Sequence, residues 1–223
     1  MLPAAAAWAG TTLFKEARFD MGFQPDEGAG GWSRVGSGAS FLLPDASLVI
    51  NDNSNTDRIA FQTLLGEVQA AHRVTLTARV KVLSNIGGDA VTMEIARPGL
   101  EAVLQLYPDG LVLLERRGTG NYRFLGTVAI DLRDYHEIVL QKSASEEGPR
   151  EILSVLIDGV AVLHATPQGE GQLGVGRLLI GSTSYADMGA SFWDWVSYRL
   201  DSVENEVSTT QTSFGRLKSR FGG

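Results

Sequence analysis

The segment Tyr135-His136-Glu137 carries residue types that serve general acid–base catalysis. Histidine titrates near neutral pH, and Asp131 and Asp134 precede it closely, so this group could move a proton to and from a substrate. The simpler interpretation is that the segment begins a strand and that His136 forms a hydrogen bond with a neighbouring loop. We favour this structural role over catalysis.

Two glutamates, Glu94 and Glu101, flank the turn Ala-Arg-Pro-Gly and could pair across a hairpin. Two carboxyl groups about 5–5.5 Å apart can act as the acid and the nucleophile of a retaining glycoside hydrolase. Acids that meet across a hairpin are also common where a sheet faces solvent. We therefore expect these two to face water and predict no hydrolytic acid pair.

The segment Asn-Asp-Asn-Ser-Asn-Thr-Asp, residues 51–57, resembles a calcium-binding loop in composition. Calcium takes hard oxygen ligands of the kind that Asp52 and Asp57 could supply. These are the only charged residues of the segment, and no glutamate follows at the required distance. Asn, Asp and Ser also form turns without metal, so calcium is a weak candidate and no other cofactor is expected.

Trp193 and Trp195 lie two positions apart, so a regular strand would point both to the same face. Exposed, they could stack on a sugar ring or dock a partner. Buried, they would form one wall of a core. The pattern of residues 191–200 leaves both alternatives open. The aromatic residues available for a sugar or contact surface are Trp32, Tyr107, Tyr122, Trp193, Trp195 and Tyr198.

The elements that would position these residues are short β-strands. In 73–83, apolar and polar residues alternate, which predicts that Val74, Leu76, Val80 and Val82 are buried while Arg79 and Lys81 are not. Pro108-Asp109-Gly110 and Asp158-Gly159 lie between apolar runs and predict two hairpins. About a dozen such strands predict an all-β, two-sheet antiparallel sandwich of the jelly-roll type.

The segments Asp-Leu-Arg-Asp-Tyr-His-Glu-Ile-Val-Leu-Gln-Lys-Ser (131–143) and Leu-Ser-Val-Leu-Ile-Asp-Gly-Val-Ala-Val-Leu (153–163), with the closing segment 189–200, carry a family resemblance. Together they resemble the laminin G-like and concanavalin A-like lectin jelly-roll superfamily over 13–200. The resemblance implies two stacked antiparallel sheets. Glycoside hydrolases of this fold commonly carry a Glu-x-Asp-x-x-Glu strand, which this sequence lacks, so we expect no enzyme.

The composition excludes several functional classes. The chain of 223 residues has no cysteine, which removes disulfides and thiolate sites. Its net charge of −7 disfavours nucleic-acid binding. No apolar run reaches the length of a transmembrane helix, and the apolar start lacks the basic residues of a secretory signal. We expect a cytoplasmic protein or one peripheral to a membrane.

The two ends depart most from the family pattern. We divide the chain into an apolar extension (1–12), the jelly-roll domain (13–200) and a C-terminal extension (201–223). The last extension contains a short amphipathic segment with a basic side. The expected partner-binding residues are Trp8, Phe214, Arg216, Leu217, Lys218, Arg220 and Phe221.

These observations favour a non-catalytic subunit that braces a larger protein assembly through its loops and ends. The partners would be other protein subunits and a membrane surface, as in a membrane-extrinsic subunit of a photosynthetic or other membrane complex. One alternative is a carbohydrate-binding, lectin-like module, for which the aromatic residues would supply the surface. A second alternative is a glycoside hydrolase, against which the missing acid spacing counts.

Overall fold

The chain forms two antiparallel β-sheets that stack face to face. The computed structural model describes residues 12–18, 24–27, 31–45, 47–53, 56–118, 121–144, 151–169, 171 and 174–201, and for 12–18 it describes the backbone. Within these ranges, the one helix is the single turn α1 (Glu67–Ala70). The predicted all-β sandwich is therefore confirmed.

Sheet A contains eight strands. Its order is β13 (Val160–Ala165), β12 (Glu151–Ile157), β11 (His136–Ala144), β6 (Arg73–Ile86), β15 (Met188–Asp201), β4 (Leu48–Asp52) and β3 (Ala39–Leu42). The long strand β15 pairs with β4 along its first half and with β1 (Thr12–Arg18) along its second half. The first and last described strands of the chain thus lie side by side.

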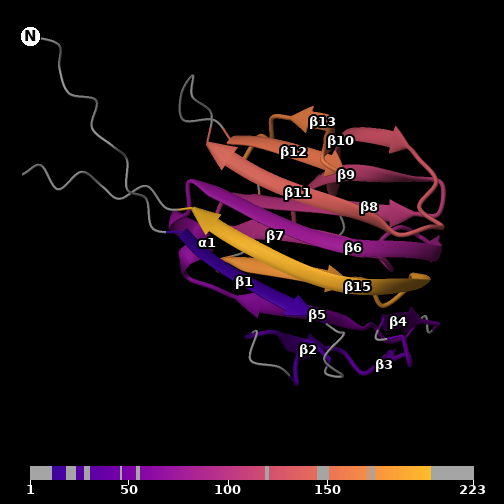
Figure 1. Cartoon of the computed structure of the whole chain (residues 1–223). Coiled ribbons are helices and arrows are strands. Elements are labelled where there is room, and N and C mark those ends of the chain that lie inside the picture. Colours follow the sequence, from indigo (N-terminus) through magenta and orange to yellow (C-terminus); the bar gives the residue numbers. More distant parts are fainter. Residues whose placement is uncertain are drawn as a thin grey trace, which may run out of the picture.

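Sheet B contains seven strands. Its order is β10 (Tyr122–Ala129), β9 (Gly110–Arg116), β8 (Leu100–Tyr107), β7 (Thr92–Arg97), β14 (Arg177–Gly181), β5 (Ala60–Leu64) and β2 (Ser33–Val35). Strands β7 to β10 follow one another in the chain and in the sheet. Figure 1 shows the strands β11, β6 and β15 of sheet A in front of the strands β7, β8 and β9 of sheet B.

The core lies between the two sheets and is lined by alternate residues of each strand. On β6, Val74, Leu76, Val80 and Val82 are fully buried. Arg79, on the other face of the strand, keeps 47% of its side chain exposed. This confirms the predicted register of β6. Other fully buried core residues are Met93, Leu104, Leu113, Ile138, Leu140, Val155 and Ile180.

Both predicted hairpins are confirmed. Tyr107 pairs with Gly110 across the first turn, and Ile157 pairs with Val160 across the second. In the second turn, Asp158 and Gly159 have φ angles of 50° and 79°. This left-handed backbone at both central residues is what a tight two-residue hairpin requires.

The tryptophans of β15 do not share a face, because the strand contains a β-bulge. The pairing of β15 with β6 shifts its register between Trp193 and Trp195. An extra residue in one strand reverses which side chains face inward beyond it. Trp193 is therefore fully buried, while Trp195 is half-buried and the next inward residue is Val196. The expectation of a shared face is wrong for this reason.

Trp32 and Tyr198 also belong to the core. Trp32 is 5% exposed, and its ring meets that of Tyr198 edge-on, with centroids 6.2 Å apart. Trp193 Nε1 donates a 2.8 Å hydrogen bond to Ser191 Oγ, which satisfies its polar atom inside the sandwich. The prediction that Trp32 and Trp193 belong to a sugar or contact surface is corrected, because both side chains are buried in the core.

The predicted partner-binding residues of both ends lie outside the described residues; they are Trp8, Phe214, Arg216, Leu217, Lys218, Arg220 and Phe221. Within the described ranges, no helix is long and apolar enough to cross a membrane.

Candidate functional site

The outer face of sheet B carries the largest group of interacting polar side chains described here. On β7, Met93 and Ile95 face the core, so Glu94 between them points to the opposite side of the sheet. On β8, Ala102 faces the core, and Glu101 points outward in the same way. Simple strand alternation therefore puts both glutamates on one outer face.

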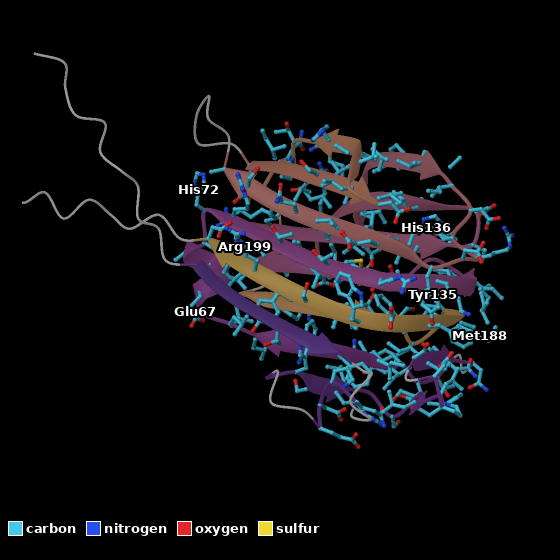
Figure 2. The ribbon with its side chains drawn as sticks, in the orientation of Figure 1. Glu67, His72, Tyr135, His136, Met188 and Arg199 are labelled. Carbon is cyan, nitrogen blue, oxygen red and sulfur yellow. The ribbon has the colours of Figure 1, made fainter. Side chains whose placement is uncertain are left out.

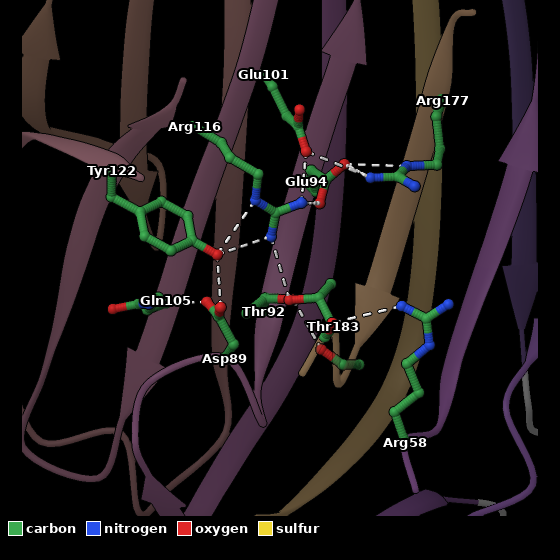
Figure 3. A network of polar contacts seen from close by, with 11 residues as sticks. Arg58, Asp89, Thr92, Glu94, Glu101, Gln105, Arg116, Tyr122, Arg177 and Thr183 are labelled. Atoms are coloured by element: carbon green, nitrogen blue, oxygen red, sulfur yellow. Dashed lines mark hydrogen bonds and ion pairs between the residues drawn. The ribbon is translucent and has the colours of Figure 1, made fainter. Parts of the chain in front are cut away.

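The pairing of the strands aligns these side chains with arginines. Tyr122 pairs with Arg116, and Glu101 pairs with Ala96, which in turn pairs with Arg177. Arg116 and Glu101 come next to the paired residues Glu115 and Ala102, so the five residues follow one row across the sheet. Ala96 has only a methyl group, which leaves space in the middle of the row. Both arginines use that space to reach Glu94 on the next row. We call Glu94, Glu101, Arg116 and Arg177 the ion-pair cluster; Figure 3 shows it from close by.

The cluster is buried and closely paired. Glu94 is fully buried and Glu101 is 4% exposed. Arg177 Nε donates a 3.0 Å hydrogen bond to Glu94 Oε1, and Arg116 Nη1 lies 3.4 Å from Glu94 Oε2. Arg116 also donates to Glu101, and Arg177 Nη2 lies 3.6 Å from Glu101 Oε1. Removing one partner would leave a buried charge uncompensated.

This burial changes proton affinities. Burial, and then the nearby charge of Glu94, raise the pKa of Glu101 above its usual range, although both arginines oppose the shift. Burial works against the Arg116 cation, but Glu94 and Glu101 outweigh it and raise the pKa of Arg116. Glu101 is thus a carboxyl group that retains its proton to higher pH than an exposed glutamate.

A chain of hydrogen bonds extends from the ion-pair cluster to the loop after β6. Arg116 Nε and Nη2 donate to Tyr122 Oη at 3.1 and 2.9 Å, and Tyr122 Oη donates to Asp89 Oδ2 at 2.5 Å. Gln105 Nε2 donates to Asp89 Oδ1 at 2.9 Å, and Tyr107 Oη donates to Gln105 Oε1 at 3.0 Å. These contacts fix the orientation of the polar groups in this series of hydrogen bonds.

The two tyrosines of this hydrogen-bond series, Tyr107 and Tyr122, keep their protons. Burial, followed by the hydrogen bond and the charge of Asp89, raises the pKa of Tyr122. Burial, followed by the charges of Asp89 and Asp187, raises the pKa of Tyr107. The two hydroxyls therefore act as hydrogen-bond donors and acceptors over the whole physiological pH range.

At the margin of the cluster lie Arg58, Thr183 and Tyr185, which we call the Arg58 corner. Arg116 Nη2 donates to Thr183 Oγ1, and Arg58 Nη1 donates to Thr183 O, both at 3.4 Å. Arg58 also stacks on Tyr185, with its guanidinium carbon 4.6 Å from the ring centroid. Figure 3 shows Thr183 between the two guanidinium groups.

Glu94 and Glu101 do come together across the β7–β8 hairpin, as the sequence suggested. They do not face water, because Arg116 and Arg177 cover them. The expectation of solvent-facing acids is wrong for this reason. Arg116 could have been found from the sequence, since extending the pairing from the turn at Pro108-Asp109 places it opposite Glu101. Arg177 and Asp89 carried no local signal.

The Tyr135-His136-Glu137 segment lies elsewhere, at one end of sheet A (Figure 2). His136 Nδ1 lies 2.7 Å from Asp158 Oδ2, and the Glu137 backbone N–H donates to Asp158 Oδ1 at 2.9 Å. Asp158 is the turn residue of the β12–β13 hairpin. The interpretation that His136 bonds to a neighbouring loop is confirmed. Asp131 forms an exposed pair with Arg133.

The predicted calcium ligands have different surroundings. Asp52 is 1% exposed and lies on β4, where it pairs with Gly189 of β15. The Asp57 carboxylate accepts from the Ser37 backbone N–H and hydroxyl and from the Arg58 backbone N–H. In the described part of the chain, no three His, Asp or Glu side chains are grouped to hold a metal ion. Calcium binding by 51–57, partly outside the described residues, stays a prediction.

The proteins that resemble this chain are similar to it in structure rather than in sequence. No family model and no curated protein sequence matches the chain. A carbohydrate esterase, vb_24B_21 from the Shiga toxin-encoding bacteriophage phi24B, shares the fold with a TM-score of 0.61 and 14% identity, over 87% of this chain and 100% of that one. The cellulose-induced protein Cip1 has a TM-score of 0.56 and 13% identity, over 82% and 95%.

An endo-1,3-β-glucanase from Streptomyces sioyaensis is a third neighbour, with a TM-score of 0.51 and 14% identity over 91% of this chain and 100% of that one. At such identities the likeness shows the fold alone, an antiparallel β-sandwich of the jelly-roll type. A closer relationship to laminin G domains is not shown.

These neighbours correct two expectations. The interpretation as a non-catalytic bracing subunit of a membrane complex is contradicted, because the neighbours are described as a carbohydrate esterase, a cellulose-induced protein and a glucanase. The expectation that the chain is no enzyme is contradicted by the two neighbours described as enzymes. That expectation relied on the missing Glu-x-Asp-x-x-Glu strand and on Glu94 and Glu101 facing water, whereas here these two acids meet from adjacent strands and are buried.

Proposed function

We propose that this protein recognises carbohydrate through the outer face of sheet B. The observation that carries the proposal is the oriented row of guanidinium, carboxyl, hydroxyl and amide groups formed by the ion-pair cluster with Tyr122, Asp89 and Gln105. A sugar presents hydroxyls that both donate and accept hydrogen bonds. Planar groups with fixed orientation match such hydroxyls at little further cost in side-chain entropy.

Two further features support this face. Arg116 and Arg177 keep 15% and 18% of their side chains exposed, so their outer edges reach the surface while their inner edges are held by the glutamates. Tyr185, 53% exposed, adds an aromatic surface beside them. A sugar could then bond to the arginines and lay its apolar side on the ring. The carbohydrate-related names of the three neighbours of this fold agree with that chemistry.

A second candidate function is hydrolysis of the bound sugar. Glu101 favours it, because a carboxyl group with a raised pKa beside an ionised carboxylate has the character of a general acid. Glu101 would protonate the oxygen that leaves. Glu94 is fully buried beneath Arg177 and Arg116, so it would act by its charge. A water molecule would attack the anomeric carbon as the bond to the leaving oxygen breaks, and the proton that this water releases would restore the one given up by Glu101.

A glycan array followed by calorimetric titration tests recognition. We expect at least one neutral or charged glycan to bind the full chain. Arg177→Gln and Tyr122→Phe should weaken that binding, while Arg199→Gln should leave it unchanged. Arg199 is the matched control, since it is 54% exposed on sheet A and pairs with Asp201. Melting curves of each variant separate lost binding from lost folding.

The location of the bound glycan is tested without any variant. Amide hydrogen exchange should slow at β7, β8, β9 and β14 when the glycan is present. An array without any bound glycan, or protection confined to sheet A, would contradict the proposal. Hydrolysis is tested separately with Glu101→Gln, which should abolish release of reducing ends while the glycan still binds. Equal release by both proteins would remove Glu101 as the acid.

A further inference from the structure

The Arg58 corner differs from the ion-pair cluster in how its cation is satisfied. Arg116 and Arg177 each contact two carboxylates. The Arg58 guanidinium group forms an ion pair with none among the described residues, and the one hydrogen bond of this side chain there is the 3.4 Å contact of Nη1 with Thr183 O. Its Nε is shielded from solvent and has no acceptor in the same part of the chain. The guanidinium group therefore has fewer hydrogen-bond acceptors than it has N–H donors.

The nearest carboxylate in the sequence does not remedy this. Asp57 precedes Arg58, but its two oxygens accept hydrogen bonds from Ser37 and from the Arg58 backbone N–H. These bonds, that of the Ser37 hydroxyl first, lower the pKa of Asp57, and the charge of Arg58 makes the smallest contribution to the shift. The Arg58 side chain is instead held by stacking on Tyr185. Stacking fixes the plane of the guanidinium group. Because Nε is shielded from solvent, an acceptor from outside would have to approach the Nη end of the group.

Arg34, on strand β2 of sheet B, is a matched arginine whose hydrogen bonds are satisfied. Arg34 on β2 also lies over an aromatic ring, with its guanidinium carbon 5.5 Å from the centroid of Phe61. Unlike Arg58, it donates from Nε to Asp26 Oδ2 at 3.2 Å and from Nη2 to Gln24 Oε1 at 2.7 Å. The two arginines thus share the stacking and differ in the acceptors.

We propose that the Arg58 corner binds the carboxylate of an acidic sugar, a uronic or a sialic acid residue of the glycan. This inference rests on the proposed function, because the neutral part of the glycan would lie on the neighbouring ion-pair cluster. A carboxylate in the plane of the Arg58 guanidinium accepts parallel hydrogen bonds that a neutral hydroxymethyl group cannot reproduce. Tyr185, more than half exposed, borders the position of that sugar.

Matched pairs of probes test this. Oligogalacturonate is compared with its methyl ester, and sialyllactose with its methyl ester, so that each pair differs only in the charge of a carboxyl group. We expect one acidic probe to bind about 10- to 100-fold more tightly than its neutral partner, the range of a hydrogen bond to a charged group. The pair that shows the preference distinguishes uronic from sialic acid. Sodium chloride should weaken the acidic probe more than the neutral one.

Two variants assign the preference to its residue. Arg58→Gln should abolish the difference between acidic and neutral probes and leave the neutral affinity nearly unchanged. Arg34→Gln, the stacked and paired control, should keep the full difference. Arg58→Lys, which keeps the charge without the planar fork, should retain only part of it.

The outcomes separate this inference from the proposed function. Equal binding of acidic and neutral probes overturns the inference and leaves carbohydrate recognition in place. A preference that survives in Arg58→Gln also overturns it, since the carboxylate would then be recognised elsewhere. If none of the four probes binds, the inference is overturned as well. If the glycan array is empty too, carbohydrate recognition itself is contradicted.

Discussion

The outer faces of the two sheets carry the same kinds of charged residues in opposite surroundings. On sheet A, Arg79 pairs with Asp194 at 2.6 Å, and the two side chains are 47% and 33% exposed. On sheet B, Arg177 pairs with Glu94, whose side chain has no exposed surface. Both pairs span antiparallel strands, so secondary structure does not explain the difference.

The rows around each pair explain it. On sheet B, Ala96 leaves space in which two arginines and two glutamates converge, and each covers the others. On sheet A, Arg79 lies over Tyr135 at the surface, and its carboxylate partner Asp194 keeps a third of its side chain exposed. Pairs in water are weakly coupled, whereas pairs removed from water fix their geometry and change proton affinity. A binding face requires the second condition.

The largest expected effect is that of Arg116→Ala, which removes the cation shared by both glutamates of the cluster. Glu94 and Glu101 would then remain buried with one arginine between them. We expect the free energy of unfolding to fall by about 3–5 kcal/mol, the cost of breaking a buried ion pair on one side. Urea unfolding at neutral pH measures it. A loss below ~1 kcal/mol would contradict the view that the two faces differ in coupling.

The fold was predictable from local signals, and the site only in part. Alternation in β6 and the Asp-Gly turns are properties of neighbouring residues, so the sandwich and its hairpins could be read from the sequence. The β-bulge in β15 could not, because it depends on pairing with β6, and it separates Trp193 from Trp195. The pairing of Glu94 with Glu101 was visible, but their burial depends on Arg177, which is 83 positions from Glu94.

A smaller effect is expected for Tyr122→Phe, which removes one hydroxyl between the cluster and Asp89. Asp89 Oδ2 loses its donor, and Arg116 Nε and Nη2 lose an acceptor, while the ring stays. We expect a loss of about 1–3 kcal/mol in the free energy of unfolding, as for buried polar groups left without a partner. Tyr135→Phe on sheet A, which removes a hydrogen bond with Ser47, is the matched change and should cost less.

The pH dependence of stability should have opposite signs on the two faces. The pKa of Glu101 is raised on folding, so the folded state holds its proton more tightly than the unfolded state. Its contribution therefore falls as pH rises from about 4.3, the ordinary value, through the folded pKa. The pKa of Asp158 is lowered by the hydrogen bonds from His136 and Glu137. Its contribution is present above about 3.9 and is lost as pH falls through the folded pKa.

Urea midpoints measured across the acidic range separate the two. Glu101→Gln should remove part of the decline in stability toward neutral pH, and Asp158→Asn should remove part of the decline at the acid end. The Asp158 effect should be the smaller one, because 55% of its side chain is exposed. If Glu101→Gln changes the urea midpoint only at the acid end of the pH range, the burial of Glu101 does not raise its pKa in solution.

The smallest expected effect is that of Arg79→Ala on sheet A. This change removes the 2.6 Å contact with Asp194 and the stacking on Tyr135, at 5.2 Å from the ring centroid. Because Asp194 keeps 33% of its side chain exposed, the loss of Arg79 does not leave it as a fully buried charge. We expect the free energy of unfolding to change by less than about 1 kcal/mol, and added salt to reduce the difference further. A loss as large as that of Arg116→Ala would mean that the outer face of sheet A is as strongly coupled as the ion-pair cluster, and exposure would no longer distinguish the two faces.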